Sequence, residues 1–333
     1  MPDAAHERVQ RELFLRTLFD IPPPSELAEL LAAKMKDRHF EAGDFIYERG
    51  QPSGTMVFIH RGTVELIAPG EEPWVYVDRA FIGAIDANMR RPHVRSARAV
   101  TALDAVEIHF EEYQMLLEDF FEFQKASLLQ SARSTFETAM SLAHDELFEA
   151  PALETSSWLS HPAMDQVQRM MALRRAHAFE SAPVQALVTL AEHADEIRLA
   201  EGETLFKAGA PNQGFMVLVK GLVEVSATSP KLRGRLGPGC SVPGIIALDP
   251  RPPLMTAVAA TEAIVLRIAH EDLFDAFEEH ADLIRAWWKF MGAETERIRK
   301  RLAGRSPTKS LLDERNRTQP RASRARGRSE RLV

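Results

Sequence analysis

The side chains of this chain that are best suited to bind a charged group lie in one short segment that contains Arg90, Arg91, His93, Arg95 and Arg98. A guanidinium group stays charged and donates several hydrogen bonds in one plane, which suits carboxylates and phosphates. Residues two apart in a strand share a face, so His93 and Arg95 are expected on the same side, where a protonated imidazole would add to the positive field. The segment therefore predicts either an anion site or a solvated basic edge, the commoner place for arginine.

Other kinds of chemistry have no candidate residues. The 11 histidines are scattered, without the His-Glu-x-x-His spacing or the cysteine partners that would hold zinc. The sequence has no Walker-type loop, no Gly-x-Ser-x-Gly motif and no kinase signature. We therefore expect a protein that is not an enzyme and that has no metal site.

The elements that must position the basic segment belong to a pattern that occurs twice. The stretch EAGDFIYERGQPSGTMVFIHRGTVEL at 41–66 aligns without a gap with AEGETLFKAGAPNQGFMVLVKGLVEV at 200–225. Apolar and polar residues alternate from Phe45 onward, which is the period of half-buried antiparallel strands. Gly62 and Gly221 each separate two such runs, where a tight turn needs a positive φ. The repeat predicts a duplicated domain, each copy a small sandwich or barrel.

This doubled pattern resembles the cyclic-nucleotide-binding domain. It consists of a glycine with an acidic residue, an apolar pair, a second glycine and then Gly-x-Val-Glu. That domain is the β-roll sensor of the catabolite activator protein and of protein kinase A regulatory subunits. The resemblance covers most of residues 10–140 and again 165–303. It implies an α+β, mainly β, fold with two jelly-roll-like β-rolls, each flanked by lead-in and closing α-helices.

The segments around each repeat agree with that arrangement. Helical periodicity predicts lead-in helices over 7–18 and 164–175 and closing helices over 110–144 and 269–302. The aromatic residues of the closing segments are Phe120, Phe121, Phe123, Trp287, Trp288 and Phe290. They could cap a purine by stacking, or pack between roll and helix or between two protomers, and we favour the packing role.

In the family, a phosphate-binding cassette holds the ligand. Its glycine admits backbone N–H groups to the cyclic phosphate, its glutamate accepts from the ribose 2′-hydroxyl, and its arginine binds the phosphate oxygens. The resemblance places the two cassettes at 81–99 and 242–260. It assigns to the two pockets the residues Gly83, Ala84, Ile85, His93, Arg95, Ser96, Ala97, Gly244, Ile245, Ile246, Met255 and Thr256.

Both cassettes depart from the family pattern. Ala84 in the first cassette and Ile245 in the second stand where the glutamate belongs. Met255 stands where the arginine of the second cassette belongs. A buried phosphate without a cationic partner loses charge-assisted hydrogen bonds of roughly 1.5–3 kcal/mol each. We therefore expect no ordinary cyclic AMP affinity in the second pocket. Arg251 lies nearby, but the two prolines that follow it are expected to aim it at solvent.

The first pocket remains open between two interpretations. Arg95 is kept, so the pocket could bind cAMP, cGMP or another small anion. Asp86 would oppose an anion if it faced the site, and the missing carboxylate at position 84 removes the anchor of the sugar. The expectation for cofactors is accordingly none, with cAMP or cGMP in the first pocket as the alternative.

Length and charge suggest how the chain is divided. Its 333 residues, 45% of them hydrophobic, suffice for two cores. We predict a first domain over 1–149, a linker over 150–163, a second domain over 164–303 and a disordered basic tail over 304–333. That tail holds nine Arg or Lys against three Asp or Glu, whereas the whole chain has a net charge of −7.

A single cysteine, Cys240, excludes an intramolecular disulfide and favours a reducing compartment. The sequence has no run of apolar residues long enough to span a bilayer and no amino-terminal signal segment. We therefore predict a cytoplasmic protein without a transmembrane segment.

These features predict a regulatory or scaffold protein with degenerate ligand pockets that acts through protein–protein contacts. The first alternative is a genuine sensor of cAMP or cGMP that uses the first pocket. The second is an adaptor that binds RNA or an anionic membrane through its basic tail. The protein partner is not identified by the sequence, and the long closing helices are a candidate surface for self-association. No helix-turn-helix pattern follows the second closing helix, so DNA binding of that type is not expected.

Overall fold

The fold is taken from a computed structural model, which describes residues 9, 11–13, 16, 26–78, 80–141, 148–149, 163–227 and 232–302. The predicted linker, apart from Ala163, and the predicted basic tail lie outside the described residues. In the first lead-in segment, the described residues 9, 11–13 and 16 are helical. No helix of the described ranges combines the length and the apolar character that crossing a membrane requires.

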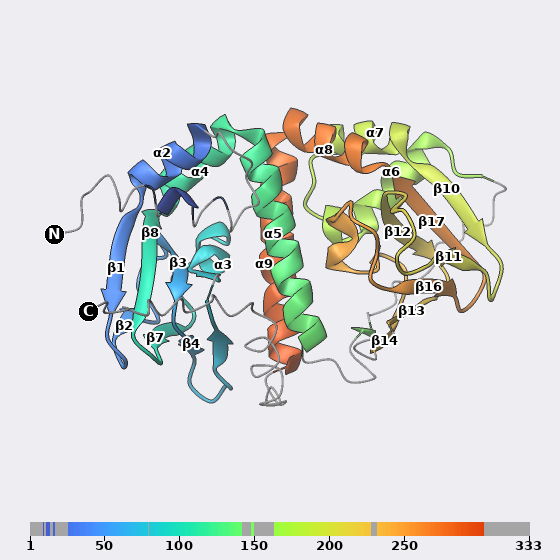
Figure 1. The fold of residues 1–333 in the computed structure, drawn as a ribbon. Coiled ribbons are helices and arrows are strands. Elements are labelled where there is room, and N and C mark those ends of the chain that lie inside the picture. The colour runs from blue at the N-terminus through green and yellow to red at the C-terminus, as the bar shows by residue number, and fades with distance from the viewer. Residues whose placement is uncertain are drawn as a thin grey trace, which may run out of the picture.

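The first half of the chain is a roll made of two four-stranded antiparallel sheets (Figure 1). One sheet has the order β1 (Lys36–Phe40), β8 (Leu103–His109), β3 (Thr55–Arg61) and β6 (Phe81–Ile82). The other has the order β2 (Phe45–Tyr47), β7 (Ser96–Ala99), β4 (Val64–Ile67) and β5 (Trp74–Tyr76).

The second half repeats this order strand for strand. One sheet contains β10 (Asp195–Leu199), β17 (Ala263–Ile268), β12 (Phe215–Lys220) and β15 (Ser241–Val242). The other contains β11 (Thr204–Phe206), β16 (Thr256–Ala259), β13 (Val223–Ala227) and β14 (Leu232–Leu236), with β9 (Phe148–Glu149) added in parallel at its edge. The predicted duplication and the predicted fold, two rolls with flanking helices, are confirmed.

The paired glycines of the repeat make the tight turns that the sequence predicts. Gly62 and Gly221 have φ values of 117° and 84°. A Cβ would lie 2.6 Å from the carbonyl oxygen of Ala102 at the first position and 2.2 Å from that of Glu262 at the second. Both the left-handed backbone and the close approach exclude a side chain, so the same residue is needed twice.

The helices lie where the sequence analysis predicts them, but there are more of them than predicted. The second lead-in is α6 (Gln166–Arg175), which begins with a capping box between Asp165 and Gln168. Each predicted closing segment is divided in two, as α4 (Phe110–Asp119) and α5 (Phe121–Ser141), and as α8 (His270–Glu279) and α9 (Ala281–Leu302). Helices α2 (Glu26–Lys34) and α7 (Val184–His193) were not predicted.

Helices α5 and α9 lie side by side between the two rolls (Figure 1). The hydroxyl groups of Thr135 in α5 and Thr295 in α9, which are 160 positions apart, are 2.9 Å from each other. The helices themselves begin the same distance apart, at Phe121 and Ala281. Equivalent residues that meet each other mark an approximate two-fold axis, the relation found in an isologous dimer interface. The chain therefore forms within itself a pairing of the kind that two protomers usually make.

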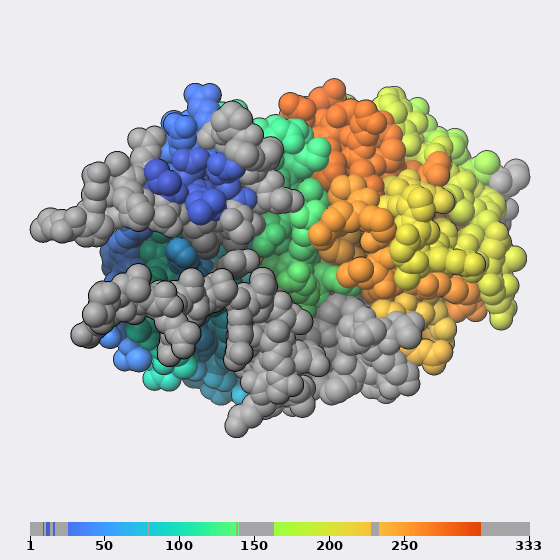
Figure 2. All heavy atoms as spheres, in the orientation of Figure 1, coloured from blue at the N-terminus to red at the C-terminus, as the bar shows by residue number. Residues whose placement is uncertain are grey.

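Each of the two helices packs against the half to which it does not belong. The side chains of Leu128, Ala132 and Phe136 in α5 are part of the hydrophobic core of the second half. Trp288 in α9 packs against the cores of both halves. On the face shown in Figure 2, α5 fills the boundary between the two halves. The closing helices, predicted as a surface for self-association, thus have faces already covered within the chain.

The aromatic residues of the closing helices support the packing interpretation. Trp287 is 1% exposed and makes edge-to-face contacts with Phe179, Phe215 and Phe277, at ring-centre distances of 5.8, 5.4 and 5.1 Å. Phe123 is likewise buried, with its ring centre 5.5 Å from that of Tyr113. Trp287 thus joins the second roll to its closing helices, and Phe123 packs α5 against α4.

Gly292 tests the fit between α9 and the first roll. A Cβ at this position would lie 3.6 Å from Ile85 and 3.7 Å from Met89, both at ordinary van der Waals distance. Because alanine fits there and favours a helix over glycine, Gly292→Ala should raise the free energy of unfolding by about 0.5–1 kcal/mol. Gly292→Leu overpacks the same contact and should lower it by about 1–3 kcal/mol. Urea unfolding measures both, and an equal effect of the two variants would contradict the observed approach of α9.

Candidate functional site

The first candidate site is a cavity of about 60 Å³ inside the first roll, which we call the first cup. Its walls in the first roll include Tyr47, Leu66, Trp74, Tyr76, Gly83 and Arg95. Two residues of α9, Thr295 and Arg299, also line it. Sites for small ligands usually measure about 300–1,000 Å³, so the cup is small in the state described here.

Gly83 provides the backbone geometry that a phosphate-binding cassette needs. Its φ is 90°, and a Cβ would lie 2.5 Å from the carbonyl oxygen of Thr55. Helix α3 (Ala84–Asn88) begins directly after it. Ala84 is 6% exposed and Ile85 lies against α9, so a buried methyl group occupies the position to which the resemblance assigns the family's carboxylate.

Arg95 already has partners inside the first cup. The side chain is 4% exposed and donates hydrogen bonds of 3.2 Å to the carbonyl oxygens of Leu66 and Glu72. It forms an ion pair with the carboxylate of Glu71 and lies 4.0 Å from the ring centre of Trp74. Burial lowers the pKa of Arg95, whereas the charge of Glu71 acts in the opposite direction.

The alternative of a solvated basic edge is wrong for Arg95 and for the half-buried Arg91, and it fits Arg90 and Arg98. Arg90 and Arg98 are exposed, and Arg98 pairs with Glu65 on the adjacent strand. Burial thus distinguishes one arginine from others that look alike in the sequence.

His93 does not stand beside Arg95 in the cup. Its buried ring stacks on Tyr47 with 3.7 Å between ring centres, and its Nδ1 is 3.4 Å from a carboxylate oxygen of Asp86. Asp86 also accepts hydrogen bonds from Arg91 at 2.8 Å and from the backbone N–H of Val94 at 3.2 Å. Burial alone would raise the pKa of Asp86, but these hydrogen bonds outweigh it and lower the pKa. The negative charge of Asp86 is therefore compensated by its immediate neighbours.

The remaining predicted residues of the first cassette have structural roles. The hydroxyl group of Ser96 accepts a 2.9 Å hydrogen bond from the backbone N–H of Arg49, and Ala97 is fully buried. The residues that sequence reasoning missed are Glu71, Trp74 and Arg299. The sequence gives no signal for Arg299, because it reaches the first cup from a helix of the other half.

In the second half, strand register identifies the residue equivalent to Arg95. Tyr47 in β2 pairs with Ala97, which lies two residues after Arg95. In the same way, Phe206 in β11 pairs with Ala257, which lies two residues after Met255. Met255 is fully buried in the hydrophobic core. A thioether thus stands where the first cup has a guanidinium.

The other predicted residues of the second cassette are buried, packed against the core or hydrogen-bonded within the chain. Gly244 keeps a positive φ of 95°, and Ile245 is 7% exposed. Ile246 packs against the core, and the hydroxyl group of Thr256 accepts from the backbone N–H of Ala208 at 3.1 Å. Cavities of about 330 and 350 Å³ flank this cassette, and both also border Phe136 of α5.

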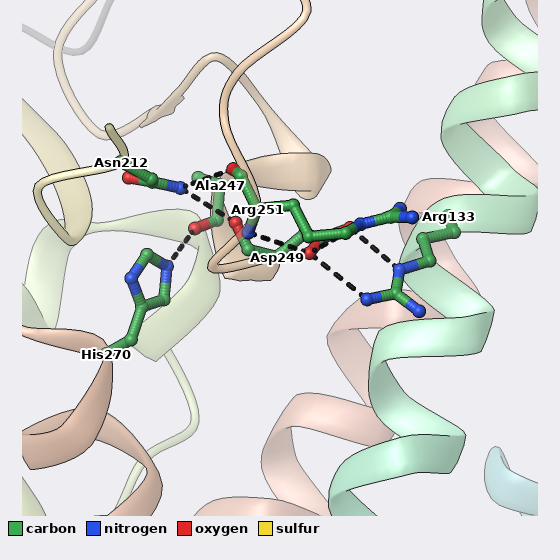
Figure 3. A network of polar contacts seen from close by, with 6 residues as sticks. All are labelled: Arg133, Asn212, Ala247, Asp249, Arg251 and His270. Carbon is green, nitrogen blue, oxygen red and sulfur yellow. Dashed lines mark hydrogen bonds and ion pairs between the residues drawn. The ribbon is translucent and has the colours of Figure 1, made fainter. Parts of the chain in front are cut away.

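A polar network ties the second cassette to the first half (Figure 3). Arg133 reaches from α5 and donates hydrogen bonds of 2.7 and 3.2 Å to the carboxylate of Asp249. Arg251 donates to the same carboxylate at 2.6 Å, and 61% of its side chain is exposed, so it is aimed at solvent, as predicted, in part only. Asn212 donates to the carbonyl oxygen of Asp249 at 2.7 Å.

The carboxylate of Asp249 should make stability depend on pH. Burial alone would raise its pKa, but hydrogen bonds from Arg133 and Arg251 outweigh burial and lower the pKa from an ordinary 3.8 to about 2. A carboxylate whose pKa is lower in the folded state than in the unfolded state stabilises the fold at pH values above its ordinary pKa. That stabilisation is lost as the pH falls towards the pKa of the folded state. The contribution is about 2 kcal/mol at neutral pH.

We expect Asp249→Asn to lower the free energy of unfolding by about 2 kcal/mol at neutral pH, with the deficit shrinking below about pH 4. Urea unfolding from neutral pH down to about pH 3 measures this, and Asp195→Asn is the control. Asp195 is also paired with an arginine, but 64% of its side chain is exposed, so its effect should be small. A deficit that does not change with pH would contradict the assignment.

Among the residues that the structure describes, no three His, Cys, Asp or Glu side chains converge so that they could hold a metal ion. Cys240 is 8% exposed, and burial raises the pKa of its thiol, which disfavours a nucleophilic role.

Solved structures similar to this chain include tandem regulatory domains of parasite kinases. One is the regulatory subunit of a cAMP-independent protein kinase A from Trypanosoma brucei, at 14% identity and a TM-score of 0.35, covering 94% of this chain and 97% of that one. Another is the regulatory domain of Toxoplasma gondii PKA with cAMP, at 13% identity and a TM-score of 0.31, covering 91% and 99%. A third is the regulatory subunit of a cAMP-independent protein kinase A from Trypanosoma cruzi bound to guanosine, at 14% identity and a TM-score of 0.34, covering 85% and 87%.

None of the curated protein sequences matches this chain. Residues 196–280, which run from β10 to the end of α8, match the family described as the cyclic nucleotide-binding domain. The first half has the same strand order in both of its sheets. The second half is therefore similar to the cyclic nucleotide-binding domain over residues 196–280, and the first half repeats the fold of the second.

Proposed function

We propose that this protein is a regulatory scaffold that binds no cyclic nucleotide in its first cup or at its second cassette and that acts through contacts with other proteins. The observation that carries the proposal is the ion pair between Arg95 and Glu71. The charge that would bind a cyclic phosphate is already neutralised by a carboxylate of the chain itself.

Space and charge support the same conclusion. The first cup has a volume of about 60 Å³, well below the usual range for a nucleotide-sized ligand. In the second half, Met255 occupies the position of Arg95 inside the core, so a phosphate there would meet an apolar side chain. Burying a phosphate without a cationic partner is strongly unfavourable.

A scaffold also needs a fixed shape and a surface for partners. The helix pair α5 and α9 joins the two cores, and the ion pair between Arg133 and Asp249 links them a second time. Val167 and Met171 on α6 are 60% and 47% exposed, and Val184 at the start of α7 is 57% exposed. Exposed apolar side chains on neighbouring helices are suited to a protein partner. A cytoplasmic location stays a prediction.

The second candidate function is a sensor that uses the first cup. It is favoured by Gly83, whose backbone keeps the geometry of the family cassette, and by the presence of Arg95. A nucleotide would have to displace Glu71 and enlarge the cavity that α9 closes. The adaptor alternative rests on the basic tail, which lies outside the described residues.

Calorimetric titration with cAMP and with cGMP distinguishes scaffold from sensor. We expect no binding up to a ligand concentration of about 1 mM, which corresponds to a binding free energy weaker than about −4 kcal/mol. We also expect no increase in the melting temperature, because only a ligand that binds the folded state stabilises it.

Arg95→Ala and Arg98→Ala form the matched control pair. They remove two arginines three positions apart, one that lines the cup and one exposed on the surface. Submicromolar binding by the unmodified chain that Arg95→Ala abolishes and Arg98→Ala leaves intact would replace the scaffold by the sensor.

A further inference from the structure

One cavity of the second half is large enough for a small molecule and has no role in the proposed function. Its volume is about 330 Å³, within the usual range of about 300–1,000 Å³ for such sites. Four parts of the chain form its walls: α5, α9, the single-turn helix η2 (His177–Phe179) and the turn between β14 and β15. We call it the junction cavity, because both halves of the chain contribute to it.

The junction cavity lies outside the interior of the second roll, where the resemblance places the ligand of the family. Strand register identifies the equivalents of four residues that line the first cup, and these are Phe206, Val225, Gly234 and Met255. None of the four lines the junction cavity, which touches the second cassette only at residues 243–245. A molecule in this cavity would therefore not occupy the predicted cyclic nucleotide site.

The walls of the junction cavity are mostly apolar. Their large apolar side chains and one small one are Phe136 and Ala139 from α5, Phe290 and Ile298 from α9, and Leu236 and Ile245 from the roll. Protein interiors are packed tightly and contain few voids larger than a water. An apolar cavity of about 150 Å³ takes up benzene. The junction cavity is roughly twice as large, so it has room for a molecule with two ring systems.

The charged side chains at the junction cavity leave no net charge for a ligand to balance. Arg297 donates hydrogen bonds of 2.9 and 2.5 Å to the carboxylate of Glu294. The other two lining residues with a formal charge, Glu180 and Lys289, are exposed and have opposite signs. Burying a charge without a partner is strongly unfavourable. The walls therefore favour an uncharged molecule over a nucleotide.

Two polar side chains of the junction cavity can orient such a molecule. They are the imidazole of the half-buried His177 and the hydroxyl group of the exposed Ser181. The backbone N–H of His177 donates a 2.9 Å hydrogen bond to the carbonyl oxygen of Gly239, which fixes η2 against the turn. A neutral imidazole and a hydroxyl group can each donate and accept. Mostly apolar walls with a few polar groups are the usual composition of a small-molecule site.

We propose that the junction cavity binds an uncharged, mostly apolar molecule of two ring systems that carries one polar group, such as an aromatic amine or alcohol. Because this ligand would contact α5, α9 and the second roll at once, it would fix the helix pair against that roll. This site goes beyond the proposed function, which concerns contacts with other proteins.

The test uses the full chain and the uncharged probe N-phenyl-1-naphthylamine, whose fluorescence rises in apolar surroundings. We expect one molecule to bind per chain, with a dissociation constant of about 100 μM or lower. The matched charged probe is 8-anilinonaphthalene-1-sulfonate, which has the same rings and an added sulfonate. It should bind about tenfold more weakly or worse, because its charge would have no partner. Equal or tighter binding of the sulfonate would overturn the assignment to an uncharged ligand.

Matched variants of α9 locate the site. Ala293 is exposed and lines the junction cavity, so Ala293→Phe fills the space and should weaken probe binding by about tenfold or more. Ala281→Phe is the control, because it makes the same change at an exposed position of the same helix that does not line the cavity. It should leave the affinity unchanged. If circular dichroism shows that Ala293→Phe does not fold, Ala286→Phe, which also lines the cavity, decides.

Cys240 provides an independent readout, because it lines the junction cavity and is the one cysteine of the sequence. A bound molecule would cover its thiol. Labelling by N-ethylmaleimide, followed by mass spectrometry, should therefore slow several-fold over the probe concentrations at which the fluorescence rises. A labelling rate that the bound probe leaves unchanged would contradict binding at this site.

Two further results would overturn the proposal. One is the absence of saturable probe binding to the unmodified chain, and the other is equal affinity in folded Ala293→Phe and Ala281→Phe. Displacement of the probe by cyclic AMP at about 1 mM would contradict both this proposal and the proposed function. Cyclic AMP binding that leaves the probe in place would contradict the proposed function alone.

Discussion

The pairing of α5 with α9 is the constraint on which the rest of the structure depends. Each helix closes one roll in sequence and packs against the other roll in space, so that Leu128 and Phe136 of α5 belong to the core of the second half. An amphipathic helix is stabilised mainly by burying its apolar face against other elements. Because both helices bury faces against both halves, neither roll has its full core without the other.

The same pairing determines the chemistry of the two cassettes. Helix α9 brings Arg299 and Thr295 to the first cup, and α5 brings Arg133 to Asp249 beside the second cassette. Each half therefore supplies charged groups to the other. A change of charge or size in one cassette would therefore alter the contacts of a helix that also packs in the opposite core, which couples the two halves physically.

The two cassettes have diverged from a shared pattern in different ways. The first keeps a buried guanidinium and balances it with Glu71, because an unpaired charge at such a site is unfavourable. The second replaces the guanidinium by the fully buried thioether of Met255, which needs no counter-ion. The first cassette thus keeps a buried charge with its counter-ion, whereas the equivalent position of the second has become part of the hydrophobic core.

The sequence by itself determined the duplication and the two rolls, because glycine turns and strand periodicity are local properties repeated about 160 residues apart, whereas the positions of the cassettes are predicted by the family resemblance. The same resemblance predicts that Ala84, Ile245 and Met255 replace ligand-binding groups of the family. Only the tertiary structure decided that Arg95 is buried against Glu71 while Arg98 is solvated, since both are arginines on one short stretch of chain. It alone placed Arg299 in the first cup, because the contact of Arg299 with Trp74 joins residues about 225 positions apart through a helix pair whose packing no local pattern encodes.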